Sequence, residues 1–223
     1  MQSPAEKKLL QLLAEATKKI LLTEQRPEII NLGAGQSLLI ENYLDAEKIE
    51  FVMDRLDISV VPVNHFRVRN YYQCSVEEMK EVNTESYDLV LANFILEHVA
   101  RIEMAAQEIS RILKTGGSFI VSVPNATAPE FLLAKMIPSN FHSMITGRKS
   151  FPTYYSYQNI DQLINIFTEQ GLVLVKKYYY SSLQSYLDRW PVGKQLARVY
   201  DFIIDALSYQ KWQGQVCLEL QKR

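Results

Sequence analysis

The chain has 223 residues, and its 24 Lys and Arg nearly balance its 25 Asp and Glu, giving a formal net charge of −1 at pH 7. This length and a hydrophobic content of 48% suit one sizeable α/β domain. Without a basic stripe, nucleic acid is not the expected partner, and Cys74 and Cys217 lack the spacing of a disulfide framework or a zinc site.

The N-terminal segment predicts a helix. Ser3 is a favourable N-cap residue, Pro4 suits the first helical turn, and leucines recur at helical spacing as far as Leu21. We expect this helix to cover a sheet rather than to act as a substrate lid. Because residues 1–24 contain no signal-peptide core and no run in the chain reaches membrane-spanning length, we expect a cytoplasmic protein without a membrane span.

A strand, a glycine turn and a helix are predicted next. The apolar run 28–32 leads into Gly33–Gly35, and a helix is predicted over 37–44. This is how a nucleotide-binding α/β unit begins, because glycine accepts positive φ and lets a ligand approach the backbone. A second strand, predicted over 49–54, ends at Asp54, whose carboxylate can accept hydrogen bonds from two ribose hydroxyls.

The remaining chain alternates strands and helices. Strands are predicted at residues 65–72, 87–93, 118–123, 172–180 and 215–221, and helices at 101–113, 127–136, 158–170 and 193–209. This alternation predicts a doubly wound, mostly parallel sheet, and the polar–apolar alternation of the last strand predicts an antiparallel edge. Ligands of such sheets bind at the carboxyl ends of the strands.

Four blocks of the sequence resemble the class I S-adenosylmethionine-dependent methyltransferases of the small-molecule type. They are Asn31–Gly35, Val52–Asp54, Tyr87–Val99 and Leu113–Asn125, of which the last two are the most specific. The resemblance implies one domain over residues 1–223, with a Rossmann-like seven-stranded sheet, an antiparallel last strand and a substrate cap at 125–157. Asn31 and Ser37 depart from the family pattern, which often has an acid and a third glycine there.

The resemblance also implies a cofactor, S-adenosyl-L-methionine, and the residues that hold it. The glycine turn would face its amino-acid end, Asp54 its ribose, the residues after the third strand its adenine, and the end of the fourth strand its methyl group. The implied cofactor-binding residues are Asn31, Gly33, Ala34, Gly35, Asp54, Cys74, Ser75, Val76, Asn93 and Phe94.

The acceptor side is less defined by the sequence. Methyl transfer needs alignment and exclusion of water, and it needs a base only when the acceptor loses a proton. The candidate catalytic residues are His142 and Tyr155, and the candidate substrate residues are His98, Arg148, Tyr154 and Tyr157. The alternative for each histidine is a positioning or surface role, and for the tyrosines it is plain packing. No metal site is predicted.

We therefore expect methyl transfer to an oxygen, nitrogen or carbon of a small molecule by direct displacement. The alternative is a methyltransferase-like domain that binds a ligand without catalysis, which Asn31 favours because it lacks the acid's charge. A nicotinamide-dependent dehydrogenase is disfavoured because Leu38 stands where a further glycine is needed. The acceptor atom and the oligomeric state stay open.

Overall fold

The computed structural model describes residues 2–23, 25–59, 63–129, 131, 152–187 and 191–223 of the chain. Its longer helices are α1 (Pro4–Leu21), α2 (Leu39–Ala46), α3 (Ile102–Ile112), α6 (Ile160–Glu169) and α8 (Pro191–Leu207). The short helices are α7 (Leu183–Tyr186), η1 (Leu96–His98) and η2 (Gln210–Trp212). The strands are β1 (Glu28–Leu32), β2 (Val52–Asp57), β3 (Val68–Gln73), β4 (Tyr87–Asn93), β5 (Leu113–Pro124), β6 (Leu172–Tyr180) and β7 (Gln215–Lys222).

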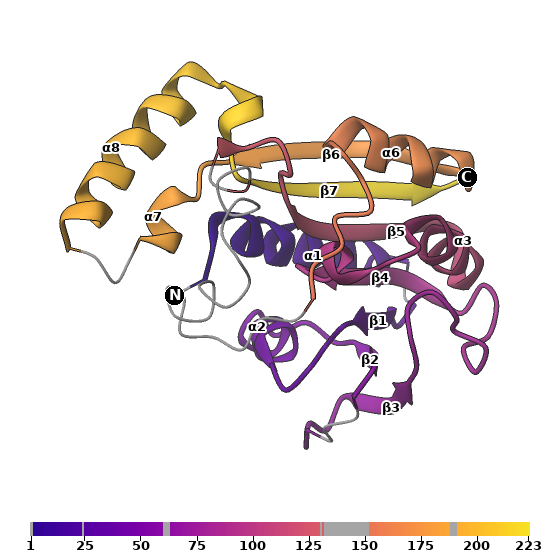
Figure 1. The fold of residues 1–223 in the computed structure, drawn as a ribbon. Helices are drawn as coiled ribbons and strands as arrows, with labels where there is room; N and C mark the ends of the chain where they lie inside the picture. The colour runs from indigo at the N-terminus through magenta and orange to yellow at the C-terminus, as the bar shows by residue number, and fades with distance from the viewer. Residues whose placement is uncertain (1, 24, 60–62, 130, 132–151, 188–190) are drawn as a thin grey trace.

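The strands form one seven-stranded sheet in the order β3-β2-β1-β4-β5-β7-β6 (Figure 1). Neighbours from β3 to β5 are parallel, and β7 is antiparallel to both β5 and β6. This confirms the doubly wound sheet with an antiparallel last strand. The carboxyl ends of the parallel strands lie at the left of Figure 1, where α7 and α8 also lie.

The prediction that the last strand forms an edge was wrong, because β7 lies between β5 and β6. Its polar side chains are buried or half-buried and find partners within the protein. Gln215 accepts a hydrogen bond from the backbone of Ala5, and Glu219 pairs with Lys176 at 3.2 Å. The polar–apolar alternation of β7 therefore reflects polar side chains that have partners inside the protein, and it does not indicate a strand that faces solvent.

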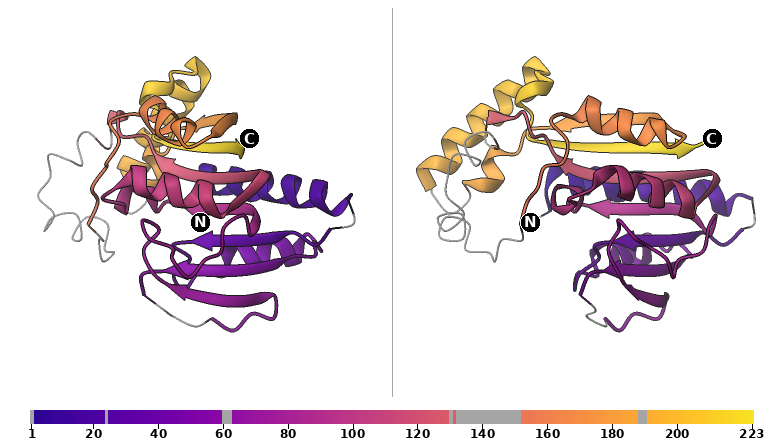
Figure 2. Two further views of the ribbon diagram at one scale, coloured as in Figure 1. Left: turned by 90° about the vertical axis from the view of Figure 1, so that its right-hand side faces the viewer. Right: turned by 45° about the vertical axis from the view of Figure 1, so that its right-hand side comes forward.

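Helices cover both faces of the sheet, as the two further views show (Figure 2). On one face α3 and α6 share a core with β1, β4, β5 and β7, in which the rings of Phe119 and Phe167 lie 5.0 Å apart. On the other face α1 and α2 bury a second cluster with Leu9, Leu13 and Leu44. Each such buried leucine stabilises the fold by roughly 1.5–3 kcal/mol.

Helix α1 covers the sheet as expected. It begins with a capping box, in which Ser3 Oγ accepts from the Glu6 amide and Glu6 accepts from the Ser3 amide. The other oxygen of Glu6 accepts a hydrogen bond of 3.0 Å from Asn93, the last residue of β4. The first turn of α1 therefore lies against the carboxyl edge of the sheet.

Two boundaries differ from the predictions in ways that matter for the site. β2 runs over Val52–Asp57 rather than 49–54, because Ile49 and Phe51 are buried in the connection from α2 instead of in a strand. Most of the helix predicted at 127–136 lies outside the described residues. Within the described part of the chain, no helix combines the length and apolar character that crossing a bilayer requires.

Candidate functional site

The glycine turn after β1 requires glycine at two positions. Gly33 and Gly35 have φ of +64° and +51°, values that cost other residues conformational energy. A Cβ on Gly33 would collide with the side chain of Ile95, whereas one on Gly35 would meet open space. The turn is thus packed against the residues after β4 on one side and open at Gly35 on the other.

Arg55, in β2, holds this turn from inside. Its Nη2 donates to the carbonyl oxygens of Ala34 (3.0 Å), Gly35 (3.1 Å) and Ser37 (2.9 Å), and its Nη1 pairs with Glu41 of α2. The two side chains are 2% and 0% exposed, so the pair is fully buried. Arg55 is not among the residues predicted from the sequence, because its tertiary partners leave no local pattern around it.

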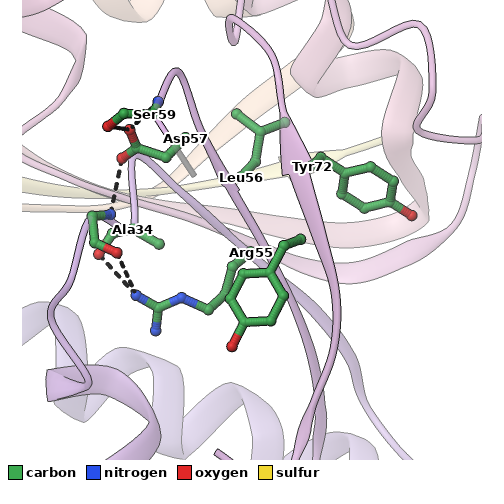
Figure 3. Close-up of a pocket in the computed structure, with 8 residues that line it drawn as sticks. Ala34, Arg55, Leu56, Asp57, Ser59 and Tyr72 are labelled. Atoms are coloured by element: carbon green, nitrogen blue, oxygen red, sulfur yellow. Dashed lines mark hydrogen bonds between the residues drawn. The ribbon is translucent and has the colours of Figure 1, made fainter. Parts of the chain in front are cut away.

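Asp57 ends β2 beside the glycine turn (Figure 3). Its Oδ2 accepts from the Gly35 amide at 2.9 Å, and its Oδ1 accepts from the amide and hydroxyl of Ser59 at 3.0 and 3.1 Å. A carboxylate has about four acceptor positions, so Asp57 retains capacity for a ligand.

A narrow crevice lies at this point. It is lined by Ala34, Gly35, Arg55, Leu56, Asp57, Ser59, Tyr71 and Tyr72. Its volume is about 10 Å³, which is room for about one water molecule. This space alone is therefore too small to enclose a nucleoside.

Asp54 does not occupy the position that the sequence predicted. It lies in the middle of β2, opposite Ile30, and it is 1% exposed. Its carboxylate pairs with Arg69 (2.8 Å) and accepts from the Tyr87 hydroxyl (2.7 Å) and the Asn70 amide (3.1 Å). The prediction that Asp54 ends the strand was wrong, since β2 continues for three residues and brings Asp57 to the edge.

Of the three residues predicted to flank the adenine after β3, two are accessible and one is buried. Cys74 and Ser75 are partly exposed, and burial raises the pKa of the Cys74 thiol. Val76 belongs to the core beneath α3. The lining of the crevice takes Tyr72 from β3 itself rather than any of these three residues.

The end of β4 lies at the same edge of the sheet as the glycine turn. Asn31, near the end of β1, is buried. Asn93 donates to Glu6, and within the described residues its Oδ1 is buried without a hydrogen-bond partner. Phe94 adopts a left-handed φ of +53°, and its amide donates to the Ser122 carbonyl. Strand β4 thus ends in a sharp turn, and Ile95 comes to lie over Gly33.

The predicted acceptor-side residues differ in exposure, although the amides of Tyr154 and Tyr155 both donate to the Glu97 carbonyl next to His98. Tyr157 is 1% exposed and donates to the Pro124 carbonyl, so it packs in the core. Tyr154 is 57% exposed. His98 lies 2.8 Å from the Pro152 carbonyl through Nδ1. Tyr155 is half-buried with φ of +46°, and its amide donates to the Glu97 carbonyl. The candidates His142 and Arg148 lie outside the described residues.

Glu97, in η1, is a residue that sequence analysis passed over in favour of its neighbour His98. Its side chain is 6% exposed, and burial raises the pKa of its carboxyl group to about 7. Its Oε2 has no hydrogen-bond partner among the described residues. The same part of the chain holds no group of three or more His, Cys, Asp and Glu placed to bind a metal ion.

Residues 1–177 match the family described as "Methyltransferase domain". The chain belongs to this family of S-adenosylmethionine-dependent methyltransferases. The mitochondrial ubiquinone biosynthesis O-methyltransferase of Rattus norvegicus is 29% identical over 154 residues, which cover 65% of this chain and 44% of the rat protein. The match thus spans less than half of that relative.

Solved structures agree on the fold. The [4+2]-cyclase SpnF superposes with a TM-score of 0.61 at 18% identity, covering 98% of this chain and 81% of the cyclase. Phosphoethanolamine N-methyltransferase 2 of Haemonchus contortus, in complex with S-adenosyl-L-methionine, superposes with a TM-score of 0.57 at 13% identity. That match covers 89% of this chain and 49% of the other. At such identities the likeness concerns the fold alone.

Proposed function

We propose that the protein transfers the methyl group of S-adenosyl-L-methionine to a small-molecule acceptor by direct displacement. The observation that carries the proposal is the bond between the Gly35 amide and Asp57, which joins the glycine turn to an acidic strand end at one edge of the sheet. Family membership supplies the cofactor, and this edge is where ligands of doubly wound sheets bind.

The proposed roles follow from position. The carboxylate of Asp57 replaces Asp54 as the group that accepts hydrogen bonds from the ribose hydroxyls. Gly33–Gly35 face the amino-acid end of the cofactor, and Asn93 and Phe94 lie toward its methyl group. The bound cofactor supplies a methyl group made electrophilic by a sulfonium. The chain's own residues align the acceptor and exclude water.

We infer that the methyl acceptor is a hydroxyl group on an aromatic, quinone-like ring. The rat relative is named for O-methylation in ubiquinone biosynthesis. That name describes the rat protein. For this chain, simple diphenols serve as test acceptors.

A non-catalytic binding domain is the second candidate. The crevice beside Asp57 is narrow, and Asn31 lacks the charge that the family often has there. The SpnF neighbour is named as a cyclase, so the fold serves more than methyl transfer.

Calorimetric titration with S-adenosylhomocysteine, followed by an assay with S-adenosylmethionine and 3,4-dihydroxybenzoate, separates these candidates. A dissociation constant below about 100 μM and a raised melting temperature at millimolar ligand support the cofactor site. Methylated product then supports catalysis. Binding without product on any diphenol, amine or carbon acceptor favours the non-catalytic domain, and a lack of binding contradicts the proposal.

A further inference from the structure

The segment after β4 carries an acidic residue, Glu97, two positions beyond the residue that packs on the glycine turn. Ile95 packs so tightly on Gly33 that a Cβ there would collide with it, and Glu97 follows two residues later in η1. Two residues of chain span at most about 7 Å. The backbone of Glu97 therefore lies at the carboxyl edge of the sheet, next to the residues that would hold the cofactor.

Among the described residues, no cation pairs with the Glu97 carboxylate. The carboxylate is 6% exposed, its Oε2 has no hydrogen-bond partner among the described residues, and its other interaction is with its own backbone amide. Two phenols of the segment before α6 interact with it electrostatically: Tyr155, whose amide donates to the Glu97 carbonyl, and the buried Tyr157. Burying an unpaired carboxylate is costly, so such a group is retained where it has a use.

We propose that Glu97 is the general base that takes the proton from a hydroxyl group of the acceptor. This inference rests on the proposed function and adds to it the acceptor atom, oxygen, and the residue that activates it. A hydroxyl that loses its proton is the case in which methyl transfer needs a base. Neither His142 nor Tyr155 is required for this role.

In the proposed step, bonds break and form at the acceptor oxygen and at the methyl carbon of the cofactor. The acceptor O–H bond breaks, and its proton moves to Oε2 of Glu97. The acceptor oxygen forms a bond to the methyl carbon, while the electron pair of the C–S bond stays on sulfur and converts the sulfonium to a neutral thioether. The proton leaves Glu97 for solvent when the product is released, and the step needs no oxidant or reductant.

The titration of Glu97 agrees with this role. Burial raises the pKa of its carboxyl group to about 7, which is within the range where a base is both available and effective at neutral pH. Tyr155 and Tyr157 have pKa values raised by burial and by Glu97 itself, so both phenols stay protonated there. His98 is the other titratable side chain of η1.

The test compares the wild type with Glu97→Gln, which preserves size and hydrogen bonding but accepts no proton. Glu103→Gln, an exposed position on α3, is the matched control. The assay measures transfer from S-adenosylmethionine to 3,4-dihydroxybenzoate and, in parallel, to an aromatic thiol that ionises unaided at neutral pH. Reactions are run with and without EDTA, and S-adenosylhomocysteine affinity is measured for each variant.

We expect Glu97→Gln to lower kcat with the diphenol by about 100-fold or more. KM, the affinity for S-adenosylhomocysteine and the rate of transfer to the thiol should stay within a few-fold of the wild type. A structural defect would instead lower transfer to both acceptors alike. In the wild type, kcat/KM with the diphenol should rise with pH around 7. Should Glu97→Gln fail to fold, this wild-type pH profile is the remaining test.

Several results would overturn the inference. Two concern Glu97→Gln: an unchanged kcat, or equal losses of activity with the diphenol and the thiol. Two concern the wild type: a kcat/KM that does not change with pH, or activity that EDTA abolishes, which would make Glu97 a metal ligand instead. A wild type that binds S-adenosylhomocysteine but methylates no hydroxyl probe also contradicts it. Failure of the proposed function is distinct, because it shows as absent cofactor binding or as cofactor binding without methylated product from any hydroxyl, thiol, amine or carbon acceptor.

Discussion

At the scale of single residues, the two acids of β2 have different tasks. Asp54 is buried among Arg69, Tyr87 and Asn70, and Asp57 is partly exposed beside Gly35. The positive charge of Arg69 satisfies Asp54 within the sheet, whereas the partners of Asp57 among the described residues are Gly35 and Ser59, which carry no charge. The difference predicts separable effects on binding and stability.

Replacing Asp57 by Ala should weaken S-adenosylhomocysteine binding by about 10- to 100-fold, because hydrogen bonds to a charged group contribute about 1.5–3 kcal/mol. Replacing Asp54 by Asn should instead lower the melting temperature, since it removes the buried carboxylate that accepts from Arg69, the Tyr87 hydroxyl and the Asn70 amide, and should change affinity less than about threefold. Calorimetry at a temperature where both variants are folded measures this. Greater loss of affinity in Asp54→Asn than in Asp57→Ala would restore Asp54 as the ribose ligand.

Glu97 should make stability depend on pH. Its folded-state pKa of about 7 lies above the ordinary value of 4.5, so the folded protein binds the extra proton between these values and loses stability as pH rises through that window. The loss is on the order of 3 kcal/mol at most. The melting temperature of the wild type relative to Glu97→Gln should therefore fall between pH 5 and 8 by several degrees. A constant difference across this range contradicts the assignment.

At the scale of elements, β2 and α2 jointly shape the glycine turn. Arg55 binds three carbonyl oxygens of the turn and the carboxylate of Glu41. Breaking one side of a buried ion pair costs about 3–5 kcal/mol because the other charge is left unpaired. The turn should therefore lose its shape when either partner is removed.

We expect Arg55→Met to lower the free energy of unfolding by several kcal/mol and to weaken S-adenosylhomocysteine binding. The double variant Arg55→Met with Glu41→Leu should recover much of the stability, because no buried charge remains, but not the affinity, because the carbonyl oxygens are still released. Denaturant titration and calorimetry on the same samples measure both. Recovery of affinity in the double variant would show that Arg55 does not position the turn.

The contact between β1 and the segment after β4 gives another element-scale prediction. Gly33→Ala and Gly35→Ala impose similar backbone strain, but only the first forces Ile95 to move. Gly33→Ala should therefore be the more destabilising by about 1–3 kcal/mol, and adding Ile95→Ala should remove most of the difference. Thermal denaturation measures this, and equal effects of the two glycine variants contradict the packing.

The sequence predicted some elements better than others for physical reasons. Strands β4 and β6 begin and end where their apolar runs indicated. The run that predicted β2 began at Ile49, but Ile49 and Phe51 are buried in a connection, and this shifted the strand end away from Asp57. Burial alone does not distinguish a strand from a packed loop, so the acidic residue was misassigned by three positions.

At the scale of the whole molecule, residues far apart in the sequence meet at one edge of the sheet. Glu6 of α1 bonds Asn93 of β4, and Ile95 packs on Gly33. The blocks of the family resemblance predicted the shared edge, since the order of strands fixes it. They did not predict Arg55 or Glu97, because the importance of each depends on tertiary partners that no local pattern contains.

The central claim is that one adenosyl ligand binds between the glycine turn and Asp57. A crystal structure with S-adenosylhomocysteine tests it most directly. We predict ribose hydroxyls within hydrogen-bond distance of Asp57, the ligand sulfur directed toward Asn93 and Glu97, and Asp54 still paired with Arg69. A ligand bound at the opposite edge, among Arg26, Arg67 and Arg69, would contradict the account.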